Sequence, residues 1–419
     1  MSEIKESVRL IMVDVGGNNN KFWNADLYED GHYEITYARV GATNPATGSY
    51  DGEGKFRSKI KAKLKKGYAE QKTVQENVKI EVKTGSLESV AKKQIKKTDS
   101  PVLDKLLDRL ITANIHQITS NTQIQFNDTS GVFQTPLGVV TLEGIKEAAA
   151  ILDEVYNEID GRKESFYNLI NEYLKIVPQK VGRNVLAFID EQFATHDHIR
   201  KQKDLLDSLE ISFNTLQTQT PNDDGSKTIE EKVFDLSLDV LADTGEFERL
   251  KKGFYDTRKS MHHYSNVHVK QIYDVRLDQM DRDFDKKSWG NIQEFYHGTN
   301  IANCLSIMKS GLKTAPPSSA HIAGKMFGNG VYGANCSSKS LGYSMGRWGG
   351  GSTSDGAWLF VCDFAMGKED HVRSTCRGPK SGYDSVRALA KNTSLMNDEF
   401  IIYDNAQVNI KYLIECEIK

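Results

Sequence analysis

The sequence predicts a multidomain α+β protein, because three stretches of the 419-residue chain have different residue patterns. Residues 8–40 contain three extended runs joined by polar turns, which predicts a small antiparallel sheet. Residues 141–159 repeat apolar side chains at helical spacing. Residues 226–419 alternate strand-like runs with Gly-rich loops, which predicts an α+β domain with a mainly antiparallel core.

These patterns divide the chain into residues 1–98, 99–225 and 226–419. The lysine-rich stretch 81–97 is polar and predicts a linker after the first region. The segment PNDDGSK at 221–227 predicts a loop and the second boundary. We therefore expect a sheet-containing first domain, a helical second domain and an α+β third domain.

Individual elements follow from periodicity and from turn residues. Thr141 precedes the helix at 141–159 as its N-cap, and Phe56, Ile60 and Leu64 share one stripe of a lysine-rich helix. The predicted strands are 8–15, 21–28, 32–40, 357–364, 400–403 and 412–417, and the predicted helices are 52–66, 141–159, 204–216, 247–260 and 302–309.

Composition excludes several classes of protein. The chain is 38% hydrophobic and 26% charged and has no apolar run near the ~18 residues that a membrane span needs, so we expect no membrane partner. The start MSEIKESVRLIMVDV lacks the features of a signal peptide, which favours an intracellular protein. No pair among the five cysteines forms C-x-x-C, so we expect no metal. These cysteines fit buried free thiols, and a reactive nucleophile is the minor alternative.

Charge is unevenly distributed along the chain. Residues 55–97 carry fourteen Lys and Arg against four acidic residues, although the net charge of the chain is −3. Such a local excess predicts a phosphate-binding surface. A solvated helix face is the alternative for a basic stretch considered alone.

Four motifs in the C-terminal region, taken in order, carry the side chains of a candidate active site. They are FYHGTN at 295–300, MFGNGVYGANCSSKSLGYS at 326–344, GPKSGYDSV at 378–386 and NDEFIIYD at 397–404. Together they supply one His, two Tyr, one Ser and one Glu. This set suits an enzyme that holds the nicotinamide end of NAD and breaks its glycosidic bond. Breaking that bond develops positive charge on the ribose, so the site needs a carboxylate, fixed hydrogen-bonding groups and an aromatic slot.

Each candidate also has a structural alternative. His297 beside Gly298 can point into a pocket or can cap the turn. Tyr332 and Tyr343, which flank Ser340, can sandwich a planar ring or can be ordinary core residues.

The acidic candidate has an immediate competitor. Glu399 opens an apolar run and is either catalytic or solvated. Strand alternation sends Asp398 and Glu399 to opposite faces, so only one of them can face a pocket. Lys339 lies close to the same pocket by its adjacency to Ser340.

These motifs, in this order, resemble the catalytic domain of poly(ADP-ribose) polymerases of the His-Tyr-Glu class. FYHGTN is similar to the family's W-H-G-S/T element, SSKSLGY to its S-K-S-x-x-Y element, and NDEFIIYD to its N-E-Y-I-V-Y-D segment. SGLKTAPP and MFGNGVYGAN resemble the donor loop and the strand after it. The resemblance implies NAD as substrate, and no metal.

The resemblance also implies roles for single residues. Glu399 matches the catalytic glutamate, which polarises a ribose hydroxyl and favours chain elongation. His297 matches the residue that bonds the adenosine-side ribose. Gly298 and Ser340 match the groups that hold the nicotinamide amide. The remaining matches are Tyr343 stacking on the nicotinamide, Tyr332 closing its other side, Thr299 after the glycine, Lys339 near the pocket, and Lys313 where relatives often have an Arg near the adenosine.

Two positions depart from the family pattern. Ser306 stands where relatives carry Gly, although we count it among the candidate NAD-binding residues. Asn397 stands where a Tyr often lies, in a region associated with the acceptor and with branching. The length and branching of the ADP-ribose polymer are therefore left open.

The upstream regions resemble the domains that precede this catalytic domain in DNA-dependent members. TPLGVVTLEGIKEAAAILDEV and SFYNLINEYL resemble the helical regulatory domain. NNNKFWNADLYEDGHYEITYARVG resembles a WGR domain, with Tyr37-Ala38-Arg39 at the name-giving triplet. This likeness implies binding of DNA strand breaks, for which the candidate residues are Arg39, Lys55, Lys59 and Lys63.

Taken together, we predict transfer of ADP-ribose from NAD to protein acceptors, with polymer elongation, nicotinamide release and activation by DNA breaks. The acceptors can include the protein itself. A mono-ADP-ribosyltransferase of the same fold and a catalytically silent DNA-end scaffold are the alternatives. The resemblance implies a role in DNA damage and DNA repair, with nuclear localisation in a eukaryote or cytoplasmic, nucleoid-associated localisation in a bacterium.

Overall fold

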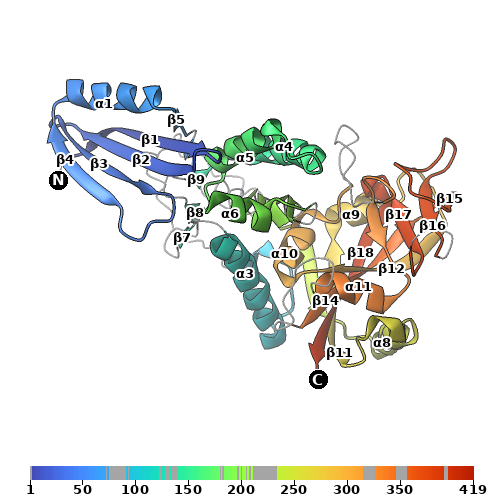
Figure 1. Ribbon diagram of the computed structural model, residues 1–419. Coiled ribbons are helices and arrows are strands. Elements are labelled where there is room, and N and C mark those ends of the chain that lie inside the picture. The colour runs from blue at the N-terminus through green and yellow to red at the C-terminus, as the bar shows by residue number, and fades with distance from the viewer. Residues whose placement is uncertain are drawn as a thin grey trace. The chain divides into compact units, whose positions relative to one another are not determined.

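The fold is taken from a computed structural model of the chain (Figure 1). The structure describes residues 2–71, 73–74, 91–92, 94–121, 125–127, 132–134, 139–179, 181, 184–195, 198–199, 201–203, 205–206, 209–210, 234–314, 326–345, 356–390 and 395–419. Contacts group the chain into two compact units, residues 1–87 with 115–231 and residues 88–114 with 232–419. Each unit is described by itself.

The first unit begins with a five-stranded antiparallel sheet in the order β4-β3-β2-β1-β5. Its strands are β1 (Ile4–Asp14), β2 (Asn19–Tyr28), β3 (His32–Arg39), β4 (Ala46–Asp51) and β5 (Ala69–Glu70). Helix α1 (Glu53–Lys65) covers one face of this sheet (Figure 1). Buried Phe56 anchors the helix on a core that includes Leu10, Trp23 and Tyr33.

The predicted strands and the helix at 52–66 are confirmed, with two differences. Leu64 is 43% exposed although the stripe on the helix places it beside Phe56 and Ile60. Strand β4 was missed, because its sequence ATGSYD has no apolar alternation, and none of its residues is buried.

The helical middle of the first unit consists of α4 (Leu142–Glu158), α5 (Glu164–Ile176) and α6 (Val185–Gln192). Thr141 caps α4 as predicted, since its hydroxyl accepts a hydrogen bond from the Gly144 amide at 3.0 Å. Short strands accompany these helices, so the middle is helical but not purely so. They are β6 (Thr73–Val74), β7 (Gln125–Asn127), β8 (Val132–Gln134) and β9 (Val139–Val140). Most of the helix predicted at 204–216 and the loop at 221–227 lie outside the described residues.

Hydrogen bonds join the N-terminal sheet to the chain at the end of α5, within the first unit. Asn171 Oδ1 accepts from the Val15 amide at 2.8 Å, and Asn20 Nδ2 donates to the Gln179 carbonyl at 3.0 Å. The side-chain Nε2 of Gln71 donates to the Lys175 carbonyl at 3.0 Å. The end of α5 is therefore fixed against the edge and turn of the sheet.

The second unit contains two sheets. A five-stranded antiparallel sheet has the order β10-β11-β18-β14-β12, and a four-stranded sheet has the order β13-β17-β16-β15. Among the described strands of this unit only β15 and β16 pair in parallel, so the core is mainly antiparallel, as predicted. The strands are β10 (Leu236–Val240), β11 (Val267–Leu277), β12 (Ile292–Thr299), β13 (Val331–Gly333), β14 (Ala357–Ala365), β15 (Glu369–Val372), β16 (Ser385–Ala388), β17 (Glu399–Ile402) and β18 (Val408–Ile418).

Helices of the second unit connect and cover these strands (Figure 1). They are α8 (Thr244–Asp256), α9 (Asp278–Asp283), α10 (Ile301–Ser310) and α11 (Ser337–Ser344), with the 3₁₀ turns η1 (Ser260–His262) and η2 (Asn405–Gln407). The predicted helices at 247–260 and 302–309 correspond to α8 and α10.

The two sheets of the second unit meet through aromatic side chains and one glycine. The rings of Phe295 and Phe400 stack with their centroids 4.2 Å apart. A side chain at Gly333 would place its Cβ 2.8 Å from the Phe295 Cβ and 2.9 Å from the Phe364 ring. Glycine at 333 therefore lets β13 approach β12 closely, which sets the geometry of the candidate site.

Helix α3 (Pro101–Asn121) begins in the second unit and runs past its boundary. Arg109 pairs with buried Glu415, and its guanidinium lies 5.0 Å from the Trp358 ring centroid. Asn114 donates to the Ala302 carbonyl at 3.2 Å. The first part of this helix thus packs on the C-terminal region. The division of the chain into domains at residues 1–98, 99–225 and 226–419 stays a prediction.

Candidate active site

The candidate site forms where β12 ends. His297 lies on the face of β12 that looks toward β13, and its Nδ1 lies 3.0 Å from the Tyr332 carbonyl oxygen. A carbonyl oxygen can only accept, so Nδ1 carries the hydrogen in this contact. This bond fixes the orientation of the imidazole, and a turn-capping role for His297 is not what the structure describes.

The backbone of β12 leaves one edge open at Gly298. Tyr296 exchanges both backbone hydrogen bonds with Ala334, at 2.9 and 3.0 Å, on the side away from β14. Residues two apart in a strand direct their backbone groups the same way. The N–H and C=O of Gly298 therefore point off this edge, beyond the Ala334 bridge, where a planar amide could bond to both groups.

Helix α11 packs against the face of β12 beside this edge. A Cβ at Gly298 would lie 1.8 Å from the Ser340 carbonyl oxygen, so no other residue fits there without moving the helix or the strand. The hydroxyl of Ser340 donates to the Tyr296 carbonyl oxygen at 3.2 Å, and Ser340 is 2% exposed. The structure thus brings Gly298 and Ser340 together at one point.

The two tyrosines differ in their surroundings. Tyr332 accepts from the Phe327 amide at 3.1 Å and donates to the Gly328 carbonyl at 2.9 Å, which fixes its phenol. Burial raises the pKa of Tyr332, and the nearby charges of Glu399 and Tyr343 raise it further, against the lowering effect of the Phe327 amide. Tyr343 is 38% exposed on α11. The Tyr332 side chain is therefore held in one orientation, whereas the exposed ring of Tyr343 could stack on a ligand.

A buried ion pair is the strongest charged contact of the site. Lys339 Nζ and Glu399 Oε1 are 2.6 Å apart, and each residue is only 8% exposed. Two charges in a nearly dry site interact more strongly than they would in water. The pair therefore directs the Glu399 side chain toward Lys339 on α11.

Strand alternation separates Glu399 from its competitor, as predicted. Asp398 Oδ2 accepts from Arg387 Nη2 at 3.0 Å, and Asp398 Oδ1 accepts from the Ala390 amide at 2.8 Å. Asp398 thus faces the neighbouring strand β16, and Glu399 faces Lys339. Of the two acids, only Glu399 lies with the other candidate residues.

Three predicted NAD-binding residues are not part of this cluster. Thr299 is the last residue of β12 and is 7% exposed. Ser306 lies on α10, where its hydroxyl is buried without a hydrogen-bond partner among the described residues. Lys313 is exposed beyond the end of α10. Their predicted contacts with NAD stay predictions.

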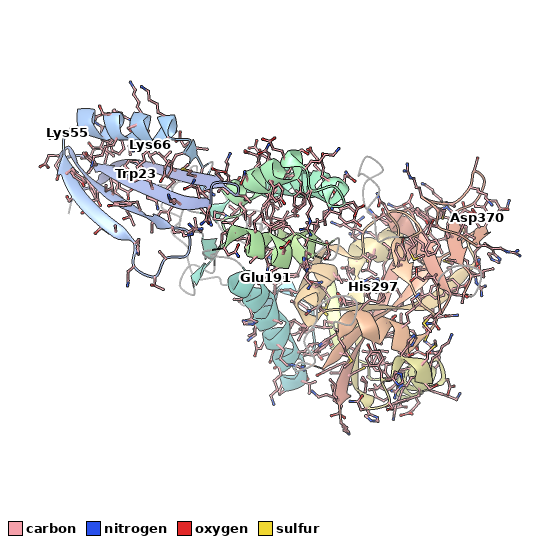
Figure 2. The ribbon with its side chains drawn as sticks, viewed as in Figure 1. Trp23, Lys55, Lys66, Glu191, His297 and Asp370 are labelled. Atoms are coloured by element: carbon pink, nitrogen blue, oxygen red, sulfur yellow. The ribbon has the colours of Figure 1, made fainter. Side chains whose placement is uncertain are left out.

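The predicted DNA-binding residues of the first unit fall into two groups. Lys55, Lys59 and Lys63 all lie on α1, and Figure 2 labels Lys55 near one end of this helix and Lys66 just past the other. Arg39 lies apart at the end of β3, where it donates to the Asn18 carbonyl at 3.0 Å and to Asn18 Oδ1 at 2.8 Å. Arg39 thus braces the turn between β1 and β2.

Two of these lysines lie over aromatic rings. Lys59 Nζ is 3.2 Å from the Tyr50 ring centroid, and Lys63 Nζ is 4.9 Å from that of Tyr68 and 5.7 Å from that of Tyr37. Burial lowers the pKa of Lys63, and the neighbouring Lys66, Lys21 and Lys59 lower it further. Clustered positive charges mark a surface that favours an anion. We call Lys59, Lys63, Tyr37 and Tyr50 the basic aromatic face.

Several residues close to the site were missed from the sequence. Lys259 and His262 contact Asn397, two positions before Glu399, and Arg109 and Asn114 bind the strands and helix beside His297. No periodicity or motif in the sequence marks these contacts, since they join segments far apart in the chain. Within the described ranges, no group of three or more His, Cys, Asp and Glu could hold a metal ion, and no helix is long and apolar enough to cross a membrane.

Comparison with known families defines the class of this fold and site. Residues 244–394 match the family described as "Poly(ADP-ribose) polymerase catalytic domain". Residues 244–394 are therefore similar to a catalytic domain that transfers ADP-ribose, and the match implies NAD as substrate. The match ends before Glu399, so that residue is placed by the structure and not by the comparison.

Individual relatives extend the similarity to almost the whole chain. The chain is 26% identical to "Protein mono-ADP-ribosyltransferase PARP3" of Mus musculus, over 98% of this chain and 87% of that protein. It is 23% identical to the protein of the same name in Homo sapiens, again over 98% and 87%. It is 27% identical to "Poly [ADP-ribose] polymerase 1" of Gallus gallus, over 67% of this chain but only 30% of that protein.

Proposed function

We propose that this protein transfers ADP-ribose from NAD to protein acceptors, elongates the product into a polymer, releases nicotinamide, and is switched on by DNA breaks. The observation that carries the proposal is the buried Lys339–Glu399 pair, 2.6 Å apart, in a catalytic domain of this family. The carboxylate lies with the open β12 edge and with Tyr343 in one unit, which suits a site that handles the nicotinamide ribose.

The proposed reaction breaks one bond and forms one. The bond between the ribose C1′ and the nicotinamide nitrogen breaks, and nicotinamide leaves with the bonding electron pair. A nucleophilic atom of the acceptor attacks C1′ and loses its proton. Positive charge builds up on the ribose during this exchange, as in glycoside hydrolysis, and a nearby carboxylate stabilises it. The contact of Glu399 with Lys339 of α11, at 2.6 Å, supports Glu399 as this carboxylate.

The nicotinamide fits the geometry of the open edge. Its carboxamide offers one donor face and one acceptor, which complement the C=O and N–H of Gly298, and Ser340 can turn its hydroxyl from Tyr296 to the same group. The partly exposed ring of Tyr343 supplies a face for the pyridine ring. His297, whose Nδ1 is directed to Tyr332, is the proposed contact for the adenosine-side ribose.

Two candidate products remain, since the family comprises relatives named for either activity. The mouse relative that aligns over most of this chain is named a mono-ADP-ribosyltransferase, and the chicken relative is named a polymerase. Both His297 and Glu399 are present here, which favours elongation. A denaturing gel of the product made from labelled NAD separates the two proposals, because elongation gives a ladder and single transfer gives one band.

The basic aromatic face is the proposed site for DNA ends. It combines lysines that neutralise phosphates with exposed tyrosines, 43% for Tyr37 and 42% for Tyr50, that can stack on unpaired bases. Lys55 extends the positive charge along α1, and Arg39 would act by bracing the sheet. This arrangement supports a role in DNA damage and repair, with nuclear localisation in a eukaryotic host.

Coupling between DNA and NAD has a physical basis within each unit. In the first unit the sheet is hydrogen bonded to the end of α5. In the second unit Asn114 of α3 binds Ala302 in α10, the helix that follows the His297 strand. We propose that DNA loosens the helical region and thereby opens the site, in which case NAD must strengthen DNA binding by the same factor. A silent DNA-end scaffold is the alternative, and it predicts no NAD consumption at any DNA concentration.

A further inference from the structure

A chain of hydrogen bonds, buried except at Lys259, includes Asn397, which lies close to Glu399 in the sequence. His262 Nδ1 lies 2.8 Å from Ser338 Oγ, and His262 Nε2 lies 3.1 Å from Asn397 Nδ2. Lys259 Nζ donates to Asn397 Oδ1 at 2.6 Å. His262 is 4%, Asn397 3% and Ser338 0% exposed. We call these four residues the His262 relay.

The donors and acceptors of the relay allow one arrangement. The Lys259 ammonium can only donate, so Asn397 Oδ1 faces it and Asn397 Nδ2 donates to His262 Nε2. His262 Nε2 must then be an unprotonated acceptor, which leaves the hydrogen on Nδ1 to be donated to Ser338 Oγ. Ser338 Oγ also accepts from the Lys259 amide at 2.9 Å. The relay is satisfied only when His262 is neutral.

The Ser338 hydroxyl completes the chain. Because its oxygen already accepts two hydrogen bonds, its own hydrogen is directed to Cys336 Sγ, 3.2 Å away. Buried networks in which every member is satisfied rigidify the segments that they join. The relay thus joins the η1 turn, the start of α11 and the residues that precede β17.

The ends of the relay lie next to the two members of the ion pair. Ser338 directly precedes Lys339, and Asn397 lies two positions before Glu399 on the same face of the chain, whereas Asp398 faces Arg387 on the other side. His262 therefore bridges the two elements whose separation sets the 2.6 Å contact.

We propose that His262 is a positioning residue that holds Glu399 against α11, and this proposal rests on the proposed function of that site. His262 is too buried to touch substrate and acts through Asn397 and Ser338. Its loss frees the start of β17 from α11, so Glu399 is misplaced relative to the ribose. A misplacement of about 1 Å can cost roughly 100-fold in rate, so turnover falls while ground-state binding of NAD to the β12 edge persists.

The experiment compares three variants of the full chain in NAD turnover with nicked DNA. His262→Ala removes the relay, and His262→Gln restores an amide oxygen that can accept from Asn397. His263→Asn is the matched control, because His263 is the adjacent exposed histidine with a φ of 57°, a conformation that Asn tolerates. We expect His262→Ala to lower kcat at least tenfold with KM for NAD within threefold of wild type. We expect His262→Gln to recover part of kcat and the control to match wild type.

Two results would overturn the proposal. One is a kcat for His262→Ala within twofold of wild type. The other is a parallel loss of kcat, NAD binding and melting temperature in the Ala and Gln variants, which marks a purely structural histidine. A wild-type chain that consumes no NAD with nicked DNA overturns the proposed function itself, whereas failure of this proposal alone leaves wild-type turnover intact.

A second readout does not depend on activity. The ¹⁵N spectrum of the histidine rings in the full chain reports tautomer and charge, and His262→Gln identifies the resonance by its disappearance. The relay requires a neutral ring with the hydrogen on Nδ1 at neutral pH. A ring with the hydrogen on Nε2, or a charged ring, would contradict the relay.

Discussion

The candidate active site and the basic aromatic face are built in opposite ways. The candidate active site is largely buried apart from Tyr343, and its groups are fixed by specific contacts such as His297 to Tyr332 and Lys339 to Glu399. The basic aromatic face is partly exposed, and its lysines lie over aromatic rings at centroid distances of 3.2 to 5.7 Å. Buried groups that must meet a small substrate need precise placement, whereas a surface that meets a phosphate backbone needs mainly charge and ring faces. Single substitutions should therefore lower turnover strongly at the candidate active site, whereas at the basic aromatic face each should lower DNA affinity by a smaller step.

The largest effect is expected at Glu399. Glu399→Gln keeps the shape of the side chain but removes the negative charge that would stabilise the positive charge developing on the ribose. We expect elongation to fall by roughly 100-fold or more, leaving at most single transfer or NAD hydrolysis. Product length and nicotinamide release are the measurements. Asp398→Asn serves as the control that faces away, and long polymer from Glu399→Gln would show that the carboxylate is assigned wrongly.

The next effect is expected at Gly298. Gly298→Ala would place a Cβ 1.8 Å from the Ser340 carbonyl oxygen, so α11 or β12 must shift. Overpacking of this kind costs about 1–3 kcal/mol, and it moves the groups that would hold the nicotinamide amide. We expect both a lower melting temperature and a raised KM for NAD.

The matched control for this substitution is Gly54→Ala. Gly54 lies in α1, and an added Cβ there meets no atom within 4 Å. Normal NAD binding by Gly298→Ala, at a stability equal to that of Gly54→Ala, would mean that the close contact between α11 and β12 is not required.

A smaller, graded effect is expected at the basic aromatic face. The double variant Lys59→Ala/Lys63→Ala should weaken binding to nicked DNA about equally for all sequences. It should also lower the slope of log affinity against log salt by about 1 per lysine that contacts phosphate. Turnover at saturating DNA should stay near wild type. Lys252→Ala, at an exposed lysine of the second unit that pairs with Asp256, is the control. An unchanged salt slope would place the DNA site elsewhere.

The smallest effect is expected at the packing of α3 on the catalytic sheet. Arg109→Leu removes the contact to Glu415 but keeps an apolar group over Trp358. Glu415 retains Lys270 at 2.8 Å and Tyr273 at 2.7 Å, so the fold should survive. If α3 restrains the site, turnover without DNA should rise by about threefold, and turnover with DNA should change little. A fall in both rates would indicate that Arg109 only stabilises the fold.

The sequence predicts local structure better than long-range contacts. The strands at 8–15 and 357–364 and the helix at 141–159 follow from periodicity, because burial of one face or both faces leaves a direct trace in the residue order. Strand alternation predicts that only one of Asp398 and Glu399 can face a pocket, and the structure directs Glu399 to Lys339 and Asp398 to Arg387.

Other features leave no such trace. Strand β4 carries no buried residue, so it lacks apolar alternation. Arg39 stands in the position of a DNA contact by resemblance, yet its guanidinium braces Asn18. The His262 relay joins His262 to residues 76 and 135 positions away in the chain, and only the packed structure brings them together. Such contacts depend on tertiary packing, which periodicity and motifs do not encode.

The central claim is that a DNA-sensitive first unit controls an NAD site built around Glu399. The most direct measurement is the rate of nicotinamide release from NAD by the full chain, with and without nicked DNA, for wild type and Glu399→Gln. We predict that nicked DNA markedly raises the rate of nicotinamide release by the wild type. We also predict that Glu399→Gln makes no polymer under either condition. A wild-type rate that is zero, or that is the same with and without DNA breaks, would contradict the account.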